Sequence, residues 1–183
     1  MDNLRLSWDL FILVFFAIVI AYSFIIGRNQ TIKVIISSYM AILTADGLGN
    51  LLETYLLPAA PTLQGEMGEQ ALVLIKIFTF VLAIVILAIK GGFVVDVAPE
   101  SSLPARILGN LGFGFLNAGL MVSTILVYLT GGSFVMGSVR NSLETNLYQE
   151  SQFVQTIVDN YNVWFALPVL ALVLVSLFQR SEE

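Results

Sequence analysis

The sequence predicts an all-α protein: a polytopic membrane helix bundle with four core spans, a short fifth C-terminal span and an amphipathic extramembrane helix. Hydrophobic residues make up 57% of the 183 residues and charged residues only 11%, whereas soluble domains have about 45–50% apolar and about 25% charged residues. The mean hydropathy is +0.89. Five stretches also approach the ~20 apolar residues that a transmembrane helix needs.

The first span is Leu10–Ile26, which carries no charge. The residues before it include Asp2, Arg5 and Asp9 instead of a net positive patch, and no small-x-small cleavage site follows. A secretory signal peptide has both of these features. We therefore expect a retained span.

The second span, Ile32–Leu57, has an apolar first half and a second half that carries Asp46, Asn50 and Glu53. A continuous helix of this length exceeds the hydrocarbon core, so it must tilt, kink or leave its end among the headgroups. The alternative is that residues 44–57 form a re-entrant or interfacial segment.

Three further stretches complete the spans. Ala71–Ile89 is interrupted only by Lys76, and Ile107–Leu129 is uncharged and rich in small residues. Val163–Phe178 is short, but Trp164 at its start is typical of a membrane interface.

The chain divides into a four-span membrane module over residues 1–129, an extracytoplasmic amphipathic segment over 130–162, and the fifth span with a short cytoplasmic tail over 163–183. Asn141 and Glu144 have the spacing of a helix cap with its acidic partner. The helix that follows has an acidic polar face, whereas helices that lie on membranes usually carry Lys and Arg there. We therefore expect its apolar face to pack against the span ends or a partner.

Basic residues are distributed unequally between the two sides that alternate crossing defines. Arg28, Lys33, Lys90, Arg106 and Arg180 lie on one side, and Arg5 and Arg140 lie on the other. Because cytoplasmic loops carry the excess of Lys and Arg, the N-terminus is predicted outside and the C-terminus in the cytoplasm of a bacterial inner (plasma) membrane.

Several classes of function are disfavoured by composition. The chain has no His and no Cys, so thiolate and imidazole metal sites and the usual nucleophile–base pairs are missing. Asp46 is the only Asp expected within a span, so a catalytic Asp pair is not expected either. We predict no enzyme activity, no cofactor and no metal, and the net charge of −5 argues against a nucleic-acid partner.

A polar track is predicted from Asp46, Asn50, Glu53 and Lys76. The first three are spaced i, i+4, i+7 and so share one helix face. Lys76 falls at the depth of Glu53 on the next antiparallel helix, which predicts a Glu53–Lys76 ion pair. Charges in a bilayer are costly and mark ion or solute pathways. In the alternative interpretation the second helix leaves the membrane near Asp46, and Lys76 snorkels outward.

The fourth span carries small and amide side chains suited to close helix contact. They are Gly109, Gly112, Gly114, Asn117, Ala118, Gly119 and Ser123. Small-xxx-small pairs let membrane helices approach closely. This pattern predicts either the seam of a homo-oligomer, with Asn110 and Asn117 bonding across it, or tight packing inside one monomer.

Two segments are similar to those of a known family. The first span is followed by Gly27, Arg28 and Lys33, and then by an apolar helix that contains Ser37. An Arg-Ile-Leu-Gly motif starting at Arg106 leads into the Gly-rich fourth span. In these features the chain resembles the colicin V production protein family.

The resemblance covers roughly Leu10–Leu129 and implies a four-span bacterial inner-membrane module, implicated in colicin V export or production and in envelope homeostasis. In that family the module also occurs as the membrane part of extracytoplasmic serine proteases, but this chain has no protease domain. Pro104 and Ala105 replace the acidic residue that often precedes the basic one, and Val163–Phe178 is an added span. The family offers no agreed catalytic residues to transfer.

The predicted function is that of a non-enzymatic, self-associating accessory or scaffold protein in toxin export or production, or in envelope homeostasis. Its expected partners are the lipid bilayer, further copies of itself, and another envelope or export membrane protein. The alternative is a small oligomeric ion or solute channel or transporter lined by Asp46, Asn50, Asn110 and Asn117.

Overall fold

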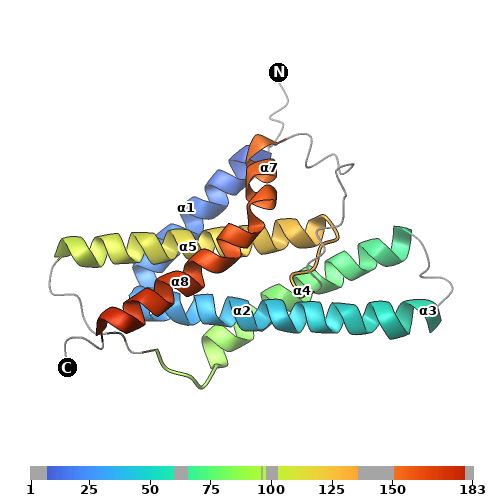
Figure 1. Cartoon of the computed structure of the whole chain (residues 1–183), viewed down its shortest axis with the longest axis horizontal. Helices are drawn as coiled ribbons and strands as arrows, with labels where there is room; N and C mark the ends of the chain where they lie inside the picture. The colour runs from blue at the N-terminus through green and yellow to red at the C-terminus, as the bar shows by residue number, and fades with distance from the viewer. Residues whose placement is uncertain (1–7, 60–65, 96, 98–102, 136–150, 180–183) are drawn as a thin grey trace.

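A computed structural model describes residues 8–59, 66–95, 97, 103–135 and 151–179 of the chain (Figure 1). The helices in these ranges are α1 (Trp8–Ile26), α2 (Arg28–Leu51), a π-helix (Leu52–Leu56), α3 (Leu57–Ala59), α4 (Glu66–Lys90), α5 (Leu103–Leu129), α7 (Gln152–Asp159) and α8 (Tyr161–Gln179). The predicted all-α membrane bundle is confirmed.

Four helical segments are long and apolar enough to cross a membrane, namely α1, α2 with its π-helical extension, α4 and α5. A fifth crossing results if α7 and α8 form one span with a 61° bend. The second segment is continuous over the 29 residues from Arg28 to Leu56. The re-entrant alternative for residues 44–57 is therefore not what the described chain shows.

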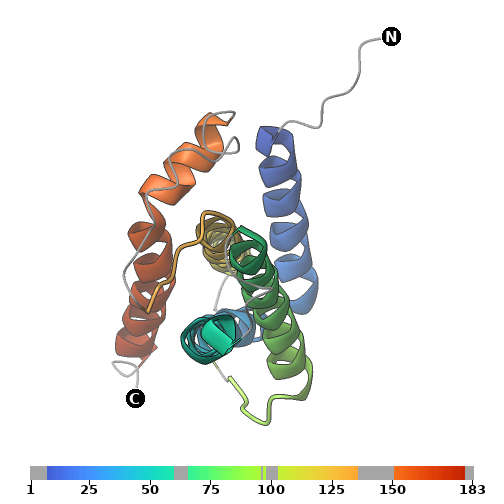
Figure 2. The same cartoon turned by 90° about the vertical axis from the view of Figure 1, so that its right-hand side faces the viewer.

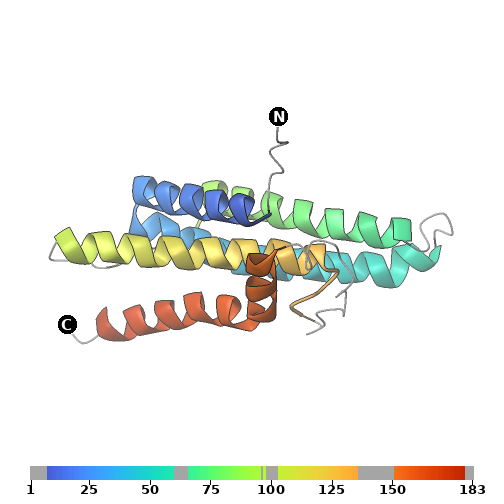
Figure 3. The same ribbon diagram turned by 90° about the horizontal axis from the view of Figure 1, so that it is seen from above.

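The helices are arranged around a central pair, α2 and α5. These two run in the same direction along the length of the bundle (Figure 1), and α4 returns antiparallel along α2. Figure 2 shows α2 and α5 nearly end-on, with α1 and α4 on one side and α7 and α8 on the other. The paired ends of α2 and α4 extend beyond the other helices (Figure 3). Successive spans cross a membrane in opposite directions. Because the single span α4 lies between α2 and α5 in the sequence, these two must run in the same direction.

A glycine makes the sharp turn between α1 and α2. Gly27 has φ of 78°, a left-handed conformation that glycine adopts without steric cost. Its N–H donates to the Ser23 carbonyl (3.0 Å) and its carbonyl accepts from the Thr31 N–H (3.0 Å). The turn lets α2 start with only Gly27 between it and the end of α1.

The main core lies between α2, α4 and α5. Its buried members are Ile32, Ile35, Ala41, Ile42, Ala45, Phe80, Phe113, Leu120 and Tyr128. In the 18-residue apolar stretch of α1 and in that of α4, only 11% is buried inside the chain. The corresponding share is 56% in α2 with its π-helical extension and 67% in α5. Apolar side chains exposed on α1 and α4 are suited to contact lipid, whereas α2 and α5 form the interior.

The α7 helix packs against span ends, as predicted for the amphipathic segment. The Ser151 side chain accepts from the Val154 N–H (3.1 Å) as a helix cap and donates to the Asp9 carboxylate in the first turn of α1. The apolar face of α7 comprises Val154, Ile157 and Val158, which join Ile12, Val122 and Leu126 in a second core. The predicted cap at Asn141 and Glu144 lies outside the described residues.

Candidate functional site

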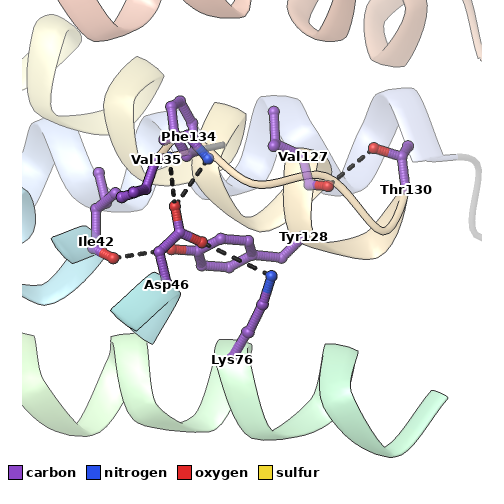
Figure 4. Close-up of polar contacts among 8 residues, drawn as sticks. All are labelled: Ile42, Asp46, Lys76, Val127, Tyr128, Thr130, Phe134 and Val135. Atoms are coloured by element: carbon purple, nitrogen blue, oxygen red, sulfur yellow. Dashed lines mark hydrogen bonds and ion pairs between the residues drawn. The ribbon is translucent and has the colours of Figure 1, made fainter. Parts of the chain in front are cut away.

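Asp46 is the most enclosed ionisable residue of the site, with a relative exposure of 0%. It lies on α2, and its Oδ2 accepts two hydrogen bonds, from the Phe134 N–H (2.8 Å) and the Val135 N–H (3.0 Å) (Figure 4). These two residues end a segment, Thr130–Val135, that we call the strap. A carboxylate that accepts backbone N–H groups forms charge-assisted bonds, which are about twice as strong as neutral ones.

The strap reaches Asp46 because α5 ends in a tight glycine turn. Gly131 has φ of 73°, and its N–H donates to the Tyr128 carbonyl (2.9 Å). The Gly132 N–H donates to the Val127 carbonyl (2.8 Å). This pattern of two bonds around a left-handed glycine is a common way to end a helix. It reverses the chain so that the next residues lie over α2.

Lys76 of α4 approaches Asp46 from the opposite side (Figure 4). Its Nζ lies 3.9 Å from Asp46 Oδ1 and 5.9 Å from the centroid of the Tyr128 ring. The Lys76 stem passes across Gly49, where an added Cβ would lie 2.8 Å from Lys76 Cγ. The absence of a side chain at Gly49 therefore gives Lys76 its path to the carboxylate.

The site balances one buried negative charge with one buried positive charge. Lys76 is only 7% exposed, and a buried charge is tolerated when it is paired and hydrogen-bonded. The Tyr128 hydroxyl donates to the Ile42 carbonyl one turn before Asp46 (3.3 Å), which fixes α5 to α2 beside the carboxylate. Three helices and the strap thus meet at Asp46.

The predicted Glu53–Lys76 ion pair is wrong, because Lys76 pairs with Asp46 and Glu53 is exposed. The prediction counted Lys76 from Ala71, but α4 begins at Glu66. Lys76 is therefore ten residues into α4, and Asp46 is ten residues before the helical segment ends at Leu56. Lys76 does not snorkel outward either, because it is 7% exposed and lies beside Asp46. That the second helix leaves the membrane near Asp46 stays a prediction.

Asn110 and Asn117 of the predicted lining do not lie beside Asp46, whereas Asn50 is one turn from it on α2. Among the residues that the structure describes, the buried side-chain oxygens without a hydrogen-bond partner are Asp46 Oδ1, Asn50 Oδ1, Asn110 Oδ1 and Asn117 Oδ1. Asn117 and Asn110 precede Tyr128 on α5 by 11 and 18 residues, or about 16 and 27 Å along the axis. These oxygens therefore lie at several depths of the bundle and do not form a single cluster.

The small residues of α5 pack inside the chain. An added Cβ at Gly114 would lie 3.0 Å from Ser23 Cβ on α1, and one at Gly119 would overlap the Trp164 ring of α8. Asn117, Ala118 and Ser123 are also buried, Gly109 is half-buried, and Gly112 is exposed. Most of the predicted oligomer seam is thus buried inside the chain, with Gly114 against α1 and Gly119 against α8.

Sequence reasoning missed the aromatic cluster that holds the strap on α8. The Phe134 ring stacks on Phe165 with 5.0 Å between centroids, and it lies 5.8 Å from Tyr161 and 6.3 Å from Tyr128. The Gly131-Gly132 pair was the only sequence signal for a turn here. Phe134 follows that pair, but its α8 partners, Tyr161 and Phe165, are distant in sequence.

Lys33 makes a second polar contact, which the sequence did not predict. In the sequence analysis Lys33 contributed only to the assignment of topology. Its Nζ donates to the Gly91 carbonyl (3.0 Å) and lies 5.3 Å from the centroid of the Phe93 ring. Gly91 directly follows α4, and its N–H donates to the Leu87 carbonyl (2.9 Å). Lys33 therefore holds the end of α4 against the start of α2.

The described residues contain no group of three or more His, Cys, Asp or Glu side chains that could hold a metal ion. No protein-family model matches the chain, and no curated protein or solved structure is significantly similar to it. Function must therefore be argued from the geometry.

Proposed function

We propose that this chain is a non-enzymatic multi-pass protein of the bacterial plasma membrane, with its N-terminus outside and its C-terminus in the cytoplasm. It acts as an accessory or scaffold in export or envelope maintenance, the role that the resemblance to the colicin V production family implies. The observation that supports this proposal best is that the two buried charged side chains make their contacts within the chain itself. Asp46 and Lys76 hold segments of the chain to one another.

The buried hydroxyl groups support the same proposal. Ser37, Ser38 and Thr124 each donate to a backbone carbonyl four residues earlier, at 2.8, 2.9 and 2.7 Å. A nucleophile would instead donate to a general base within hydrogen-bond reach. These hydroxyl groups satisfy their own helices, as is usual inside membrane bundles.

The experiment that tests the scaffold proposal is the native mass of the gently extracted protein, with all co-purifying chains identified. We expect a stable association with an export or envelope protein. That association should persist in Asp46→Asn if the variant is folded, because Asp46 is buried within the bundle. A partner-free protein of the same mass in the membrane extract and in purified form would contradict the proposal.

Topology can be tested separately because the chain has no cysteine. Single Glu66→Cys and Arg140→Cys variants should react with a membrane-impermeant thiol reagent from outside, and Lys90→Cys should react from the cytoplasmic side. Labelling of the first two from the cytoplasmic side alone would contradict the proposed orientation.

A second candidate function, a small oligomeric channel or transporter, is favoured by one specific observation. Four buried carboxylate and amide oxygens on α2 and α5 have no hydrogen-bond partner, and each such group costs about 1–3 kcal/mol when it stays unsatisfied. Water or a cation passing along the bundle would satisfy them.

Ion flux into liposomes separates the two candidates. A channel should lose or change its flux in Asp46→Asn and keep it in Glu53→Gln, which alters an exposed carboxylate farther along the same helical segment. A scaffold should give no protein-dependent flux in either variant or in the wild type.

A further inference from the structure

The strap is attached at two points in different ways. At its start it is fixed by the glycine turn that ends α5, where the Gly131 and Gly132 N–H groups donate to α5 carbonyls. At its other end, the Phe134 and Val135 N–H groups both donate to one oxygen, Asp46 Oδ2. We propose that the strap is a charge-dependent latch, which the negatively charged carboxylate of Asp46 holds closed and which opens when a neutral side chain replaces that carboxylate.

The first step is that a single anionic oxygen holds two donors. A carboxylate accepts through both of its oxygens, whereas a protonated acid or an amide also carries donor hydrogens and has weaker acceptors. A neutral side chain at position 46 therefore cannot hold both backbone N–H groups of the strap with the same strength. The glycine turn does not depend on Asp46 and remains as the hinge.

The other groups that face Asp46 cannot take over the role of its carboxylate. Lys76 approaches from α4 and the Tyr128 ring from α5, while the strap presents the uncharged Phe134 and Val135 (Figure 4). Lys76 and the strap amides are all donors, so Lys76 cannot replace the carboxylate. Loss of the negative charge also leaves the Lys76 ammonium buried without its counter-charge, which favours opening further.

The latch controls the attachment of α8 to the rest of the bundle. Phe134 stacks on Phe165 and lies close to Tyr161, both on α8. The Phe165 carbonyl in turn accepts a hydrogen bond from the Tyr39 hydroxyl of α2. When the strap opens, Phe134 leaves this cluster, so the charge of Asp46 on α2 is coupled to the attachment of α8. This coupling goes beyond either proposed function, because it applies to a scaffold and to a channel.

The latch can be tested by thiol labelling of the full-length protein in liposomes, because the chain has no cysteine of its own. Ser133→Cys places a reporter within the strap, at a position that is 4% exposed in the closed arrangement. Val135→Cys, at a position that is 57% exposed, gives the rate for an accessible strap thiol. The measured quantity is the ratio of the two labelling rates.

We expect Asp46→Asn to raise this ratio by on the order of tenfold or more, the change that loss of a charge-assisted hydrogen bond produces. Glu53→Gln should leave the ratio unchanged. Equal ratios in wild type and Asp46→Asn, or an equal rise in Glu53→Gln, would overturn the latch.

A second variant covers the case in which Asp46→Asn does not fold. Val135→Pro removes one of the two N–H donors and leaves the carboxylate and Lys76 in place. It should raise the labelling rate of the Ser133→Cys reporter several-fold above that in the otherwise unaltered chain. An unchanged rate in a folded Val135→Pro protein would overturn the latch independently of Asp46.

Discussion

The two ends of α2 each use a charged side chain to hold the segment that follows another helix. Near its start, Lys33 donates to the Gly91 carbonyl just after α4. Near its far end, Asp46 accepts from the Phe134 and Val135 N–H groups after α5. The two contacts have opposite polarity, and each matches the backbone group that it meets.

The two ends differ in how the charge is compensated. Lys33 is half-buried, on the side predicted to be cytoplasmic, and it lies at the C-terminus of α4, where the helix dipole favours a cation. Asp46 is fully buried and has the ammonium of Lys76 at 3.9 Å. The degree of burial therefore decides whether a charge needs a counter-charge. The fully buried Asp46 has the ammonium of Lys76, whereas the half-buried Lys33 has a carbonyl and an aromatic ring.

The largest expected effect is that of Asp46→Ala, which removes the strap contacts and leaves Lys76 buried without its partner. Breaking a buried pair in this way costs about 3–5 kcal/mol. Chemical unfolding of the purified protein in micelles measures the loss. Glu53→Ala, an exposed carboxylate on the same helical segment, should stay within about 0.5 kcal/mol of the wild type, and a similar loss in both variants would contradict the account.

A smaller effect is expected for Gly49→Ala, which tests the path of Lys76 to Asp46. The new Cβ would collide with the Lys76 stem, and such overpacking costs about 1–3 kcal/mol. Gly47→Ala is the matched control, because nothing lies within 4 Å of its added Cβ and alanine favours a helix over glycine. Thermal unfolding should rank Gly49→Ala below both Gly47→Ala and wild type.

The smallest effect is expected for Lys33→Met, which removes the Gly91 hydrogen bond and the contact with Phe93. Because both partners lie near the bundle surface, we expect a loss of about 1 kcal/mol, the usual net value of one hydrogen bond. The same unfolding assay measures it. If Lys33→Met costs as much as Asp46→Ala, burial does not distinguish the two ends of α2.

Hydropathy was sufficient to predict the four long spans, because a bilayer-crossing helix must be apolar over most of its length. The fifth predicted span, Val163–Phe178, lies within α8, which passes as a crossing only together with α7. Sequence reasoning also identified Asp46 and Lys76 as candidate functional residues, since charges within spans are rare. It assigned Lys76 to the wrong carboxylate because helix ends are the least certain part of such a prediction, and a start five residues earlier moves Lys76 by more than one turn.

The strap contacts could not be predicted from the sequence. Phe134 and Asp46 are 88 residues apart, and the bond is made by a backbone N–H, which every residue except proline carries. The Gly131-Gly132 pair indicates a turn but not its direction. Likewise, small residues on α5 predict close packing, but whether the neighbour is α1, α8 or a second copy depends on the tertiary arrangement.

A double-mutant cycle of Asp46→Asn and Lys76→Met tests most directly whether Asp46 and Lys76 form one buried unit. The free energy of unfolding is measured for wild type, both single variants and the double variant. We predict that the double variant is more stable than the sum of the single losses implies, by about 1–3 kcal/mol, the coupling typical of residues in contact. Additive losses, within about 0.5 kcal/mol, would contradict the account.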